Sequence, residues 1–143
     1  MFDLRRKCWA DQAFPDLRAR FPAQFESCLP GMVAIEPGWI EILERLLERI
    51  ESTGAVKHLR FSWVSIQEKY GELRAEWTFD TSIPRAALER HLGPVSAVID
   101  SAELESTWTC QICSLPATND EYLGWHMTLC AAHGALRRAV ENA

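Results

Sequence analysis

Two short cysteine-containing motifs near the C-terminus constrain the fold of this chain more than any other feature. Cys110 and Cys113 form a C-x2-C pair, Cys130 and His133 form a C-x2-H pair, and sixteen residues separate the two pairs. A C-x2-C turn directs two sulfur atoms at one point, and a second such turn placed opposite completes a tetrahedron. Three thiolates and an imidazole are typical ligands of structural zinc. The sequence therefore predicts that residues 107–143 form a zinc-ribbon-like module that binds one structural Zn²⁺ ion.

Three alternatives to this assignment remain open at the level of sequence. His126 is a second candidate for the fourth ligand, although its predicted position in the middle of a strand favours His133. The cysteines could instead be buried free thiols. The C-x2-C pair could also be a redox pair, but the βαβ pattern that surrounds such pairs in thioredoxin-like folds is missing here.

The same residues argue against a catalytic metal. Catalytic zinc usually has three protein ligands and an open position for water, whereas four protein ligands close the site. Zinc-dependent nucleobase deaminases need an H-x-E triplet and a proline before the first cysteine, but here Thr109 precedes Cys110 and no H-x-E triplet occurs. The chain also has no phosphate-binding loop, no G-x-S-x-G and no H-E-x2-H motif. We therefore expect no enzyme activity.

The central part of the chain changes from a helical to a strand period. The segment GWIEILERLLERIESTG carries an apolar stripe with the spacing of a helix over residues 38–53, and Gly54 is a natural stop. The members of the stripe are Trp39, Leu43, Leu46, Leu47 and Ile50. Apolar and polar residues then alternate over 58–67 and 72–79 on either side of Gly71, which predicts a β-hairpin.

Further helices are predicted on both sides of this unit. Pro15 and Pro22 interrupt an apolar pattern in residues 1–37, which predicts short helical turns there. After the hairpin, Arg85 to Leu92 has a helical pattern, Gly93-Pro94 should break it, and Pro94 should open a new helix. A short helix is also expected after Cys130. The predicted fold class is α+β: a helix packed on a β-hairpin, a second helix and the C-terminal module, with residues 1–106 as the core and 107–143 docked on it.

Composition limits the classes of partner. Hydrophobic residues make up 48% of the chain and charged residues 24%, as in folded globular proteins. The net charge of −5 opposes binding to nucleic acid, which a basic surface usually drives. We see no signal peptide and no segment that could span a bilayer, so we expect no membrane association and a cytoplasmic location, where thiols stay reduced. Cys8 and Cys28 lack metal-ligand spacing and are expected to be buried thiols.

The end of the predicted hairpin is the candidate surface for a protein partner. Four charged residues surround its glycine turn: Glu68, Lys69, Glu72 and Arg74. The alternative is a solvated turn with cross-strand ion pairs and no binding role.

Three blocks of the chain together resemble a group of small uncharacterised bacterial and phage proteins. GWIEILERLLERI is similar to a helix that opens with Gly-Trp in that group, and IQEKYGELR is similar to its IKEKFGTLR hairpin. The block TWTCQICSLPA … GWHMTLCAAH resembles its terminal C-x2-C-G … GW … LC-x2-H/C block. The resemblance supports the same four metal ligands. Ser114 departs from the group, which usually has glycine after the second cysteine.

These observations lead to one functional expectation and one alternative. We expect a non-catalytic zinc protein that binds a protein partner and inhibits or neutralises it. By analogy with the resembled group, this would be a phage-, defence- or immunity-type role. The alternative is a zinc-ribbon protein that binds nucleic acid.

Overall fold

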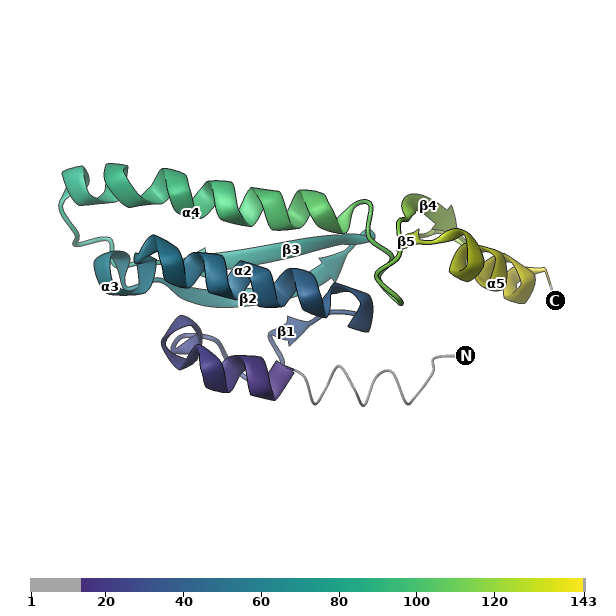
Figure 1. Cartoon of the computed structure of the whole chain (residues 1–143), viewed down its shortest axis with the longest axis horizontal. Coiled ribbons are helices and arrows are strands. Elements are labelled where there is room, and N and C mark those ends of the chain that lie inside the picture. The colour runs from purple at the N-terminus through teal and green to yellow at the C-terminus, as the bar shows by residue number, and fades with distance from the viewer. Residues whose placement is uncertain (1–13, 143) are drawn as a thin grey trace.

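The computed structural model describes residues 14–142 and confirms the α+β class (Figure 1). Residues 14–20 are helical, and Cys8 lies outside the described part of the chain. The elements that follow are η1 (Pro22–Phe25), β1 (Val33–Ala34), η2 (Pro37–Trp39), α2 (Ile40–Thr53), α3 (Ala55–Leu59), β2 (Ser62–Lys69), β3 (Glu72–Thr78), α4 (Arg85–Ser106), β4 (Thr118–Tyr122), β5 (Trp125–Leu129) and α5 (Ala131–Glu141). None of the helices in residues 14–142 combines the length and apolar character needed to cross a bilayer.

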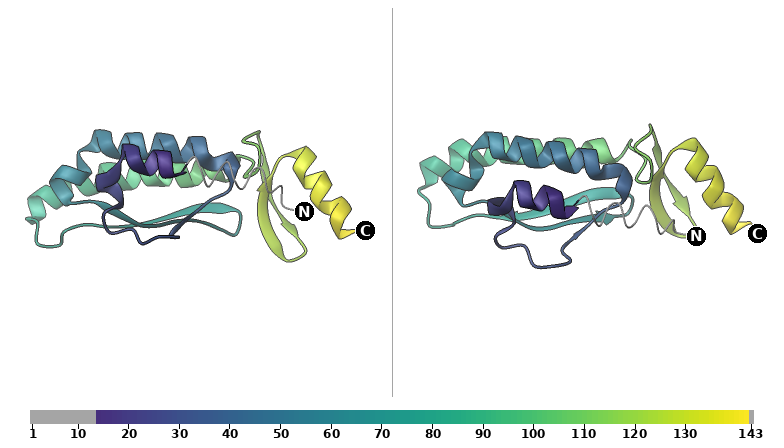
Figure 2. Two further views of the ribbon diagram at one scale, coloured as in Figure 1. Left: turned by 90° about the horizontal axis from the view of Figure 1, so that it is seen from below. Right: turned by 60° about the horizontal axis from the view of Figure 1, so that its bottom comes forward.

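The larger sheet has the strand order β1-β2-β3, with β1 parallel to β2 and β2 antiparallel to β3. Helices α2 and α4 lie side by side on one face of this sheet (Figures 1 and 2). Side chains on that face, such as Trp63, Ile66 and Leu73, are fully buried. The smaller sheet, β4-β5, lies with α5 beyond one end of the helical layer.

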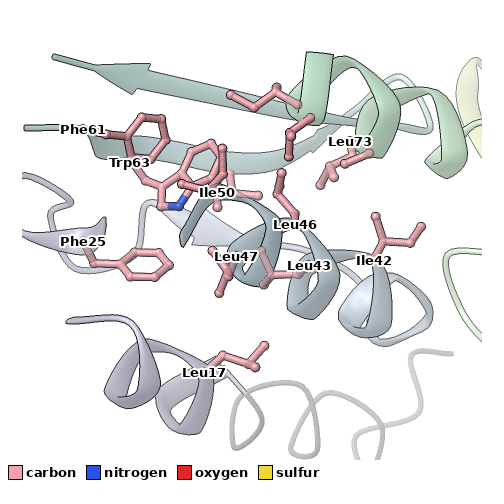
Figure 3. Close-up of a cluster of buried hydrophobic side chains, with 14 of the residues drawn as sticks. Leu17, Phe25, Ile42, Leu43, Leu46, Leu47, Ile50, Phe61, Trp63 and Leu73 are labelled. Atoms are coloured by element: carbon pink, nitrogen blue, oxygen red, sulfur yellow. The ribbon is translucent and has the colours of Figure 1, made fainter. Parts of the chain in front are cut away.

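The predicted helix over residues 38–53 is confirmed, except that its first turn is the 3-10 helix η2. All five residues of the predicted apolar stripe are buried in the core. Figure 3 shows four of them: Leu43, Leu46, Leu47 and Ile50. Each buried side chain of this size contributes roughly 1.5–3 kcal/mol to stability. Gly54 ends α2 with a left-handed φ of 73°, as expected for a helix C-terminus.

A buried polar network attaches the N-terminal segment to this core. Gln24 is fully buried, and its amide nitrogen donates to the Leu47 carbonyl at 2.9 Å and to the Glu51 carboxylate at 2.8 Å. Its amide oxygen accepts from the Trp63 indole N–H at 3.0 Å. Because each polar atom has a partner, the network orders the segment at little desolvation cost.

The predicted hairpin is present, but its first strand begins later than expected. Residues 55–59 form the short helix α3, so residues 58 and 59, predicted as the start of the strand, are helical. Ala55 and Leu59 are one helical turn apart and are both fully buried, so a helical pattern overlaps the alternating one here. Arg60, with φ of 51°, ends α3 and turns the chain into β2. At the other end, Tyr70 and Gly71 both have positive φ, the pattern of a two-residue type I′ turn.

The predicted break at Gly93-Pro94 is wrong, because α4 continues through both residues. Proline removes one backbone donor and leaves the carbonyl four residues earlier without its helical partner. Gly93 and Pro94 are exposed, so water can satisfy that carbonyl. The helix is held by its buried apolar face, formed by Val95, Val98, Ile99 and Ala102.

Candidate metal centre

The first half of the site is a tight turn that follows α4. The N–H of Cys110 donates to the Leu115 carbonyl at 2.8 Å, and the N–H of Ser114 donates to the Cys110 carbonyl at 2.9 Å. Ser114 has a φ of 71°, in the left-handed region that glycine occupies most easily. The backbone at position 114 therefore favours glycine, the residue that the resembled group usually has there.

The second half lies where β5 meets α5. Cys130 is the N-cap of α5, and its sulfur accepts a hydrogen bond from the backbone N–H of His133 at 3.5 Å. The helical turn that begins at Cys130 carries His133 three residues further on, so that its ring lies beside the sulfur. The strand and the helix thus position both groups of the C-x2-H pair.

The structure brings the four predicted ligands together into one cluster: Cys110, Cys113, Cys130 and His133. Their ligand atoms all lie within 4.8 Å of one another. The Sγ atoms of Cys113 and Cys130 are 3.7 Å apart, and His133 Nδ1 is 3.6 Å from Cys110 Sγ and 3.2 Å from Cys130 Sγ. Tetrahedral zinc with bonds of about 2.3 Å to sulfur would separate two sulfurs by about 3.8 Å. The cluster therefore has the dimensions of a tetrahedral metal site.

His126, the other candidate for the fourth ligand, is not part of this cluster. It is exposed on β5, where it pairs across the hairpin with Glu121. Strand geometry therefore separates it from the sulfur atoms.

Burial and hydrogen bonding shift the pKa values of two ligand thiols in opposite directions. Burial raises the pKa of Cys113 to about 11, and its neighbours Cys110 and Cys130 add to this effect, against an opposing hydrogen bond from the Leu115 backbone. Burial also acts to raise the pKa of Cys130, but hydrogen bonds, the first from the His133 N–H, outweigh it and lower the pKa. Metal binding must therefore displace a firmly held proton from Cys113.

The chemistry of this donor set is that of a closed site. The cluster supplies four ligand atoms, and the side chains of Cys110 and Cys130 are almost fully buried. Four protein ligands leave a tetrahedral ion no position for substrate or activated water. The cluster could therefore hold a metal ion as a structural link between the two turns.

The 3-10 helix η2, which leads into α2, packs directly against the first turn of the site. The N–H of Gly38 donates to the Gln111 carbonyl at 2.9 Å, and the Trp39 indole donates to the Thr109 carbonyl at 2.9 Å. The Ser114 hydroxyl in turn donates to the Gly38 carbonyl at 2.6 Å. A Cβ atom at position 38 would lie 2.1 Å from the Cys110 carbonyl oxygen, so only glycine fits. The Gly-Trp pair is therefore a contact between the core and the metal centre.

The turn of the β2–β3 hairpin makes a second contact with the module. The Thr128 hydroxyl donates to the Gly71 carbonyl at 2.6 Å, and the Asn119 amide donates to the Tyr70 carbonyl at 2.9 Å. A Cβ atom on Gly71 would lie 2.4 Å from the Asn119 amide and 3.0 Å from the Met127 backbone. Gly71 is thus required both for the turn and for the close approach of β5.

The four charged residues predicted as a partner surface surround this second contact. The Glu68 carboxylate accepts from the Gly71 N–H at 2.7 Å, and Arg74 pairs with Glu72 at 2.6 Å. Lys69 and Arg74 are exposed, whereas Glu68 and Glu72 are half-buried. Part of the hairpin end is therefore already used within the chain.

Two buried polar residues of the module had no sequence signal of their own. Gln111 and Thr128 are almost fully buried, and the Gln111 side-chain oxygen accepts from the Thr128 N–H at 3.0 Å. The Gln111 N–H donates to the Thr128 carbonyl at 3.0 Å. They join the first turn to β5, and no spacing rule distinguishes such residues from surface polar ones.

Comparisons of the chain with known protein families, curated proteins and solved structures found no match. The resemblance of the three sequence blocks therefore stays a prediction.

Proposed function

We propose that this chain is a non-catalytic zinc protein whose metal module presents a binding surface to a protein partner, which it inhibits or neutralises. Zinc is the proposed metal because three thiolates and one imidazole in a tetrahedral arrangement are a common structural zinc set. A reducing compartment such as the cytoplasm would keep the thiols available for the metal. The closed ligand shell supports a structural role for the metal.

The observation that carries the binding proposal is the distribution of exposed apolar side chains. Among residues 14–142, nine large hydrophobic side chains are strongly exposed, and six of them lie in the 36 residues from 107 to 142. The six are Trp108, Leu115, Leu123, Trp125, Leu136 and Val140. Tryptophan is enriched at the centres of protein interfaces, and concentrated exposed apolar residues mark binding surfaces.

Metal analysis and partner capture test this proposal separately. Protein purified without chelator should contain one zinc per chain by elemental analysis, and a content below about 0.2 equivalents would reject zinc. His133→Ala should lower metal retention, whereas the matched change His126→Ala should not.

For the partner, the tagged chain should form a stoichiometric complex with a protein from host lysate that survives size-exclusion chromatography. Charge reversal at the hairpin end, Lys69→Glu with Arg74→Glu, should weaken this complex if that surface contributes. Co-purification of nucleic acid alone, with affinity that falls steeply with salt, would instead support the nucleic-acid alternative.

A further inference from the structure

A groove runs between strand β4 and helix α5 in the module. Side chains alternate between the two faces of β4. The faces differ in what they contact: Asn119 contacts the core hairpin, whereas α5 lies on the side of Thr118, Asp120 and Tyr122. Figure 2 shows α5 on the side of the β4–β5 hairpin away from the core. The groove encloses about 590 Å³, and small apolar residues such as Pro116, Ala117, Ala131 and Ala135 form much of its walls.

Tyr122 forms part of this groove and has an unused polar group there. Its side chain is 4% exposed, and Arg138 packs over its ring at 4.5 Å from the centroid. Its hydroxyl lies 2.8 Å from where a Cβ atom on Gly134 would stand, so the absence of a side chain at position 134 makes room for it. Within residues 14–142 the hydroxyl has no hydrogen-bond partner. Among the described residues this hydroxyl is not one of the buried atoms without a partner, so it opens into the groove, where a bound group can form a hydrogen bond with it.

The outer edge of β4 adds backbone groups beside the groove. Tyr122 and Trp125 flank the two-residue turn Leu123-Gly124 and form a hydrogen-bonded pair. Hydrogen-bonded and non-hydrogen-bonded pairs alternate along an antiparallel sheet, so the N–H and carbonyl groups of Asn119 and Glu121 point away from β5. The Glu121 N–H donates to the Asp120 side chain at 2.8 Å. Just before β4 this edge is occupied, because Thr109 and Pro116 form an antiparallel bridge and the Ala117 N–H donates to the Trp108 carbonyl at 2.8 Å. Along β4 itself, no strand pairs with the edge in the described part of the chain. The N–H and carbonyl of Asn119 and the carbonyl of Glu121 are thus available to an added strand.

From these features we propose that an extended peptide segment of a protein partner binds along β4, between this strand and α5. Its backbone would pair with the free edge of β4, and a small apolar side chain would enter the groove beside Tyr122. A backbone or side-chain group of the peptide would satisfy the Tyr122 hydroxyl. The Asp120–Arg138 ion pair, at 2.7 Å, neutralises the nearby charges, so the site favours an uncharged residue at this position. This inference rests on the proposed partner-binding function and assigns it a surface.

The test uses the full zinc-loaded chain and a phage-displayed library of short random linear peptides. Selected peptides should be rich in small apolar and β-forming residues, and their affinity is then measured by calorimetry as synthetic peptides. Ala135→Trp should weaken binding at least about tenfold by filling the groove. Ala139→Trp is the matched control, because Ala139 is exposed on the same helix outside the groove, and it should bind like the unmodified chain.

Two further measurements distinguish strand addition from simple apolar contact. Tyr122→Phe removes only the hydroxyl and should weaken binding by about three- to tenfold. Peptides N-methylated at alternate positions should lose binding in one register and keep it in the other, because only one set of N–H groups faces β4.

Failure of this inference can be separated from failure of the proposed function. If no peptide is enriched, or if Ala135→Trp and Ala139→Trp have equal effects, the groove is not a peptide site. If a partner captured from lysate binds Ala135→Trp as tightly as the unmodified chain, the partner-binding function stands and the assigned surface is overturned. If peptides bind as expected but lysate contains no partner, the groove stands and the proposed function loses its support.

Discussion

The core and the metal module of this chain are stabilised in different ways. In the part of the core that the structure describes, twenty buried hydrophobic residues form one cluster between the helices and the three-stranded sheet. In the module the corresponding cluster has only four buried residues, and two of them are the ligands Cys110 and Cys130. A segment of this size cannot bury enough apolar surface to fold alone, so we expect the proposed metal to supply much of its folding free energy.

The difference also explains where apolar residues are exposed. The core is stabilised by the apolar side chains that it buries. In the module, Trp125 and Leu136 are exposed, and cross-linking by the proposed metal would not depend on them. Backbone contacts at Gly38 and Gly71 hold the two regions against each other. We therefore expect the module to act as a rigid surface on a core that stays folded without the metal.

Metal removal should have the largest effect: it should unfold the module and leave the core folded. We expect a strong chelator to abolish amide protection in residues 107–141, because about 10–16 kcal/mol of apparent binding free energy is lost from such sites. Elements α2, β2, β3 and α4 should stay protected, since their cluster contains no ligand. Hydrogen exchange followed by mass spectrometry measures both regions in one experiment. Simultaneous loss of protection throughout the chain would show that the two regions fold as one unit.

Acidification should weaken metal binding without affecting the core. Because burial raises the pKa of Cys113 to about 11, this thiol is protonated at neutral pH in the metal-free protein, and the metal must displace its proton. The apparent affinity should fall at least tenfold per pH unit, or about 100-fold from about pH 8 to about pH 6. Competition with a chromophoric chelator measures this slope. An affinity independent of pH would mean that Cys113 is not a ligand.

Gly38→Ala tests the contact between the regions. The added Cβ atom would lie 2.1 Å from the Cys110 carbonyl, which belongs to the backbone and cannot rotate away. We expect a loss of about 2 kcal/mol or more in stability, with increased exchange at residues 108–114. Gly93→Ala is the control: it lies inside α4 with open space around it and should stabilise the chain by up to about 1 kcal/mol. Equal effects of the two changes would contradict the packing described for Gly38.

The sequence predicted those parts of the structure that depend on local periodicity or ligand spacing. The α2 stripe, the Gly71 turn and the approach of the four ligands all follow from residues close together in the chain. The predictions were wrong where contacts with residues far away in the sequence determine which of two local structures forms. Pro94 should break a helix, but burial of Val95 and Val98 against other elements keeps α4 continuous. The roles of Gly38 and Thr128 depend on residues more than fifty positions away, which no local pattern contains.

The smallest effect is expected at Ser114, where two opposing contributions nearly cancel. Its left-handed φ of 71° costs a non-glycine residue about 1–2 kcal/mol, and its hydroxyl recovers about 1 kcal/mol through the hydrogen bond to the Gly38 carbonyl. Ser114→Gly removes both contributions, so the stability of the metal-loaded protein should change by less than about 1 kcal/mol. Ser114→Ala removes only the hydrogen bond and keeps the strain, so it should be the less stable of the two variants. Thermal unfolding of both variants at saturating zinc gives the order directly. If the alanine variant proves as stable as the glycine variant, the left-handed strain is negligible, and the serine is held in place by its contact with the core alone.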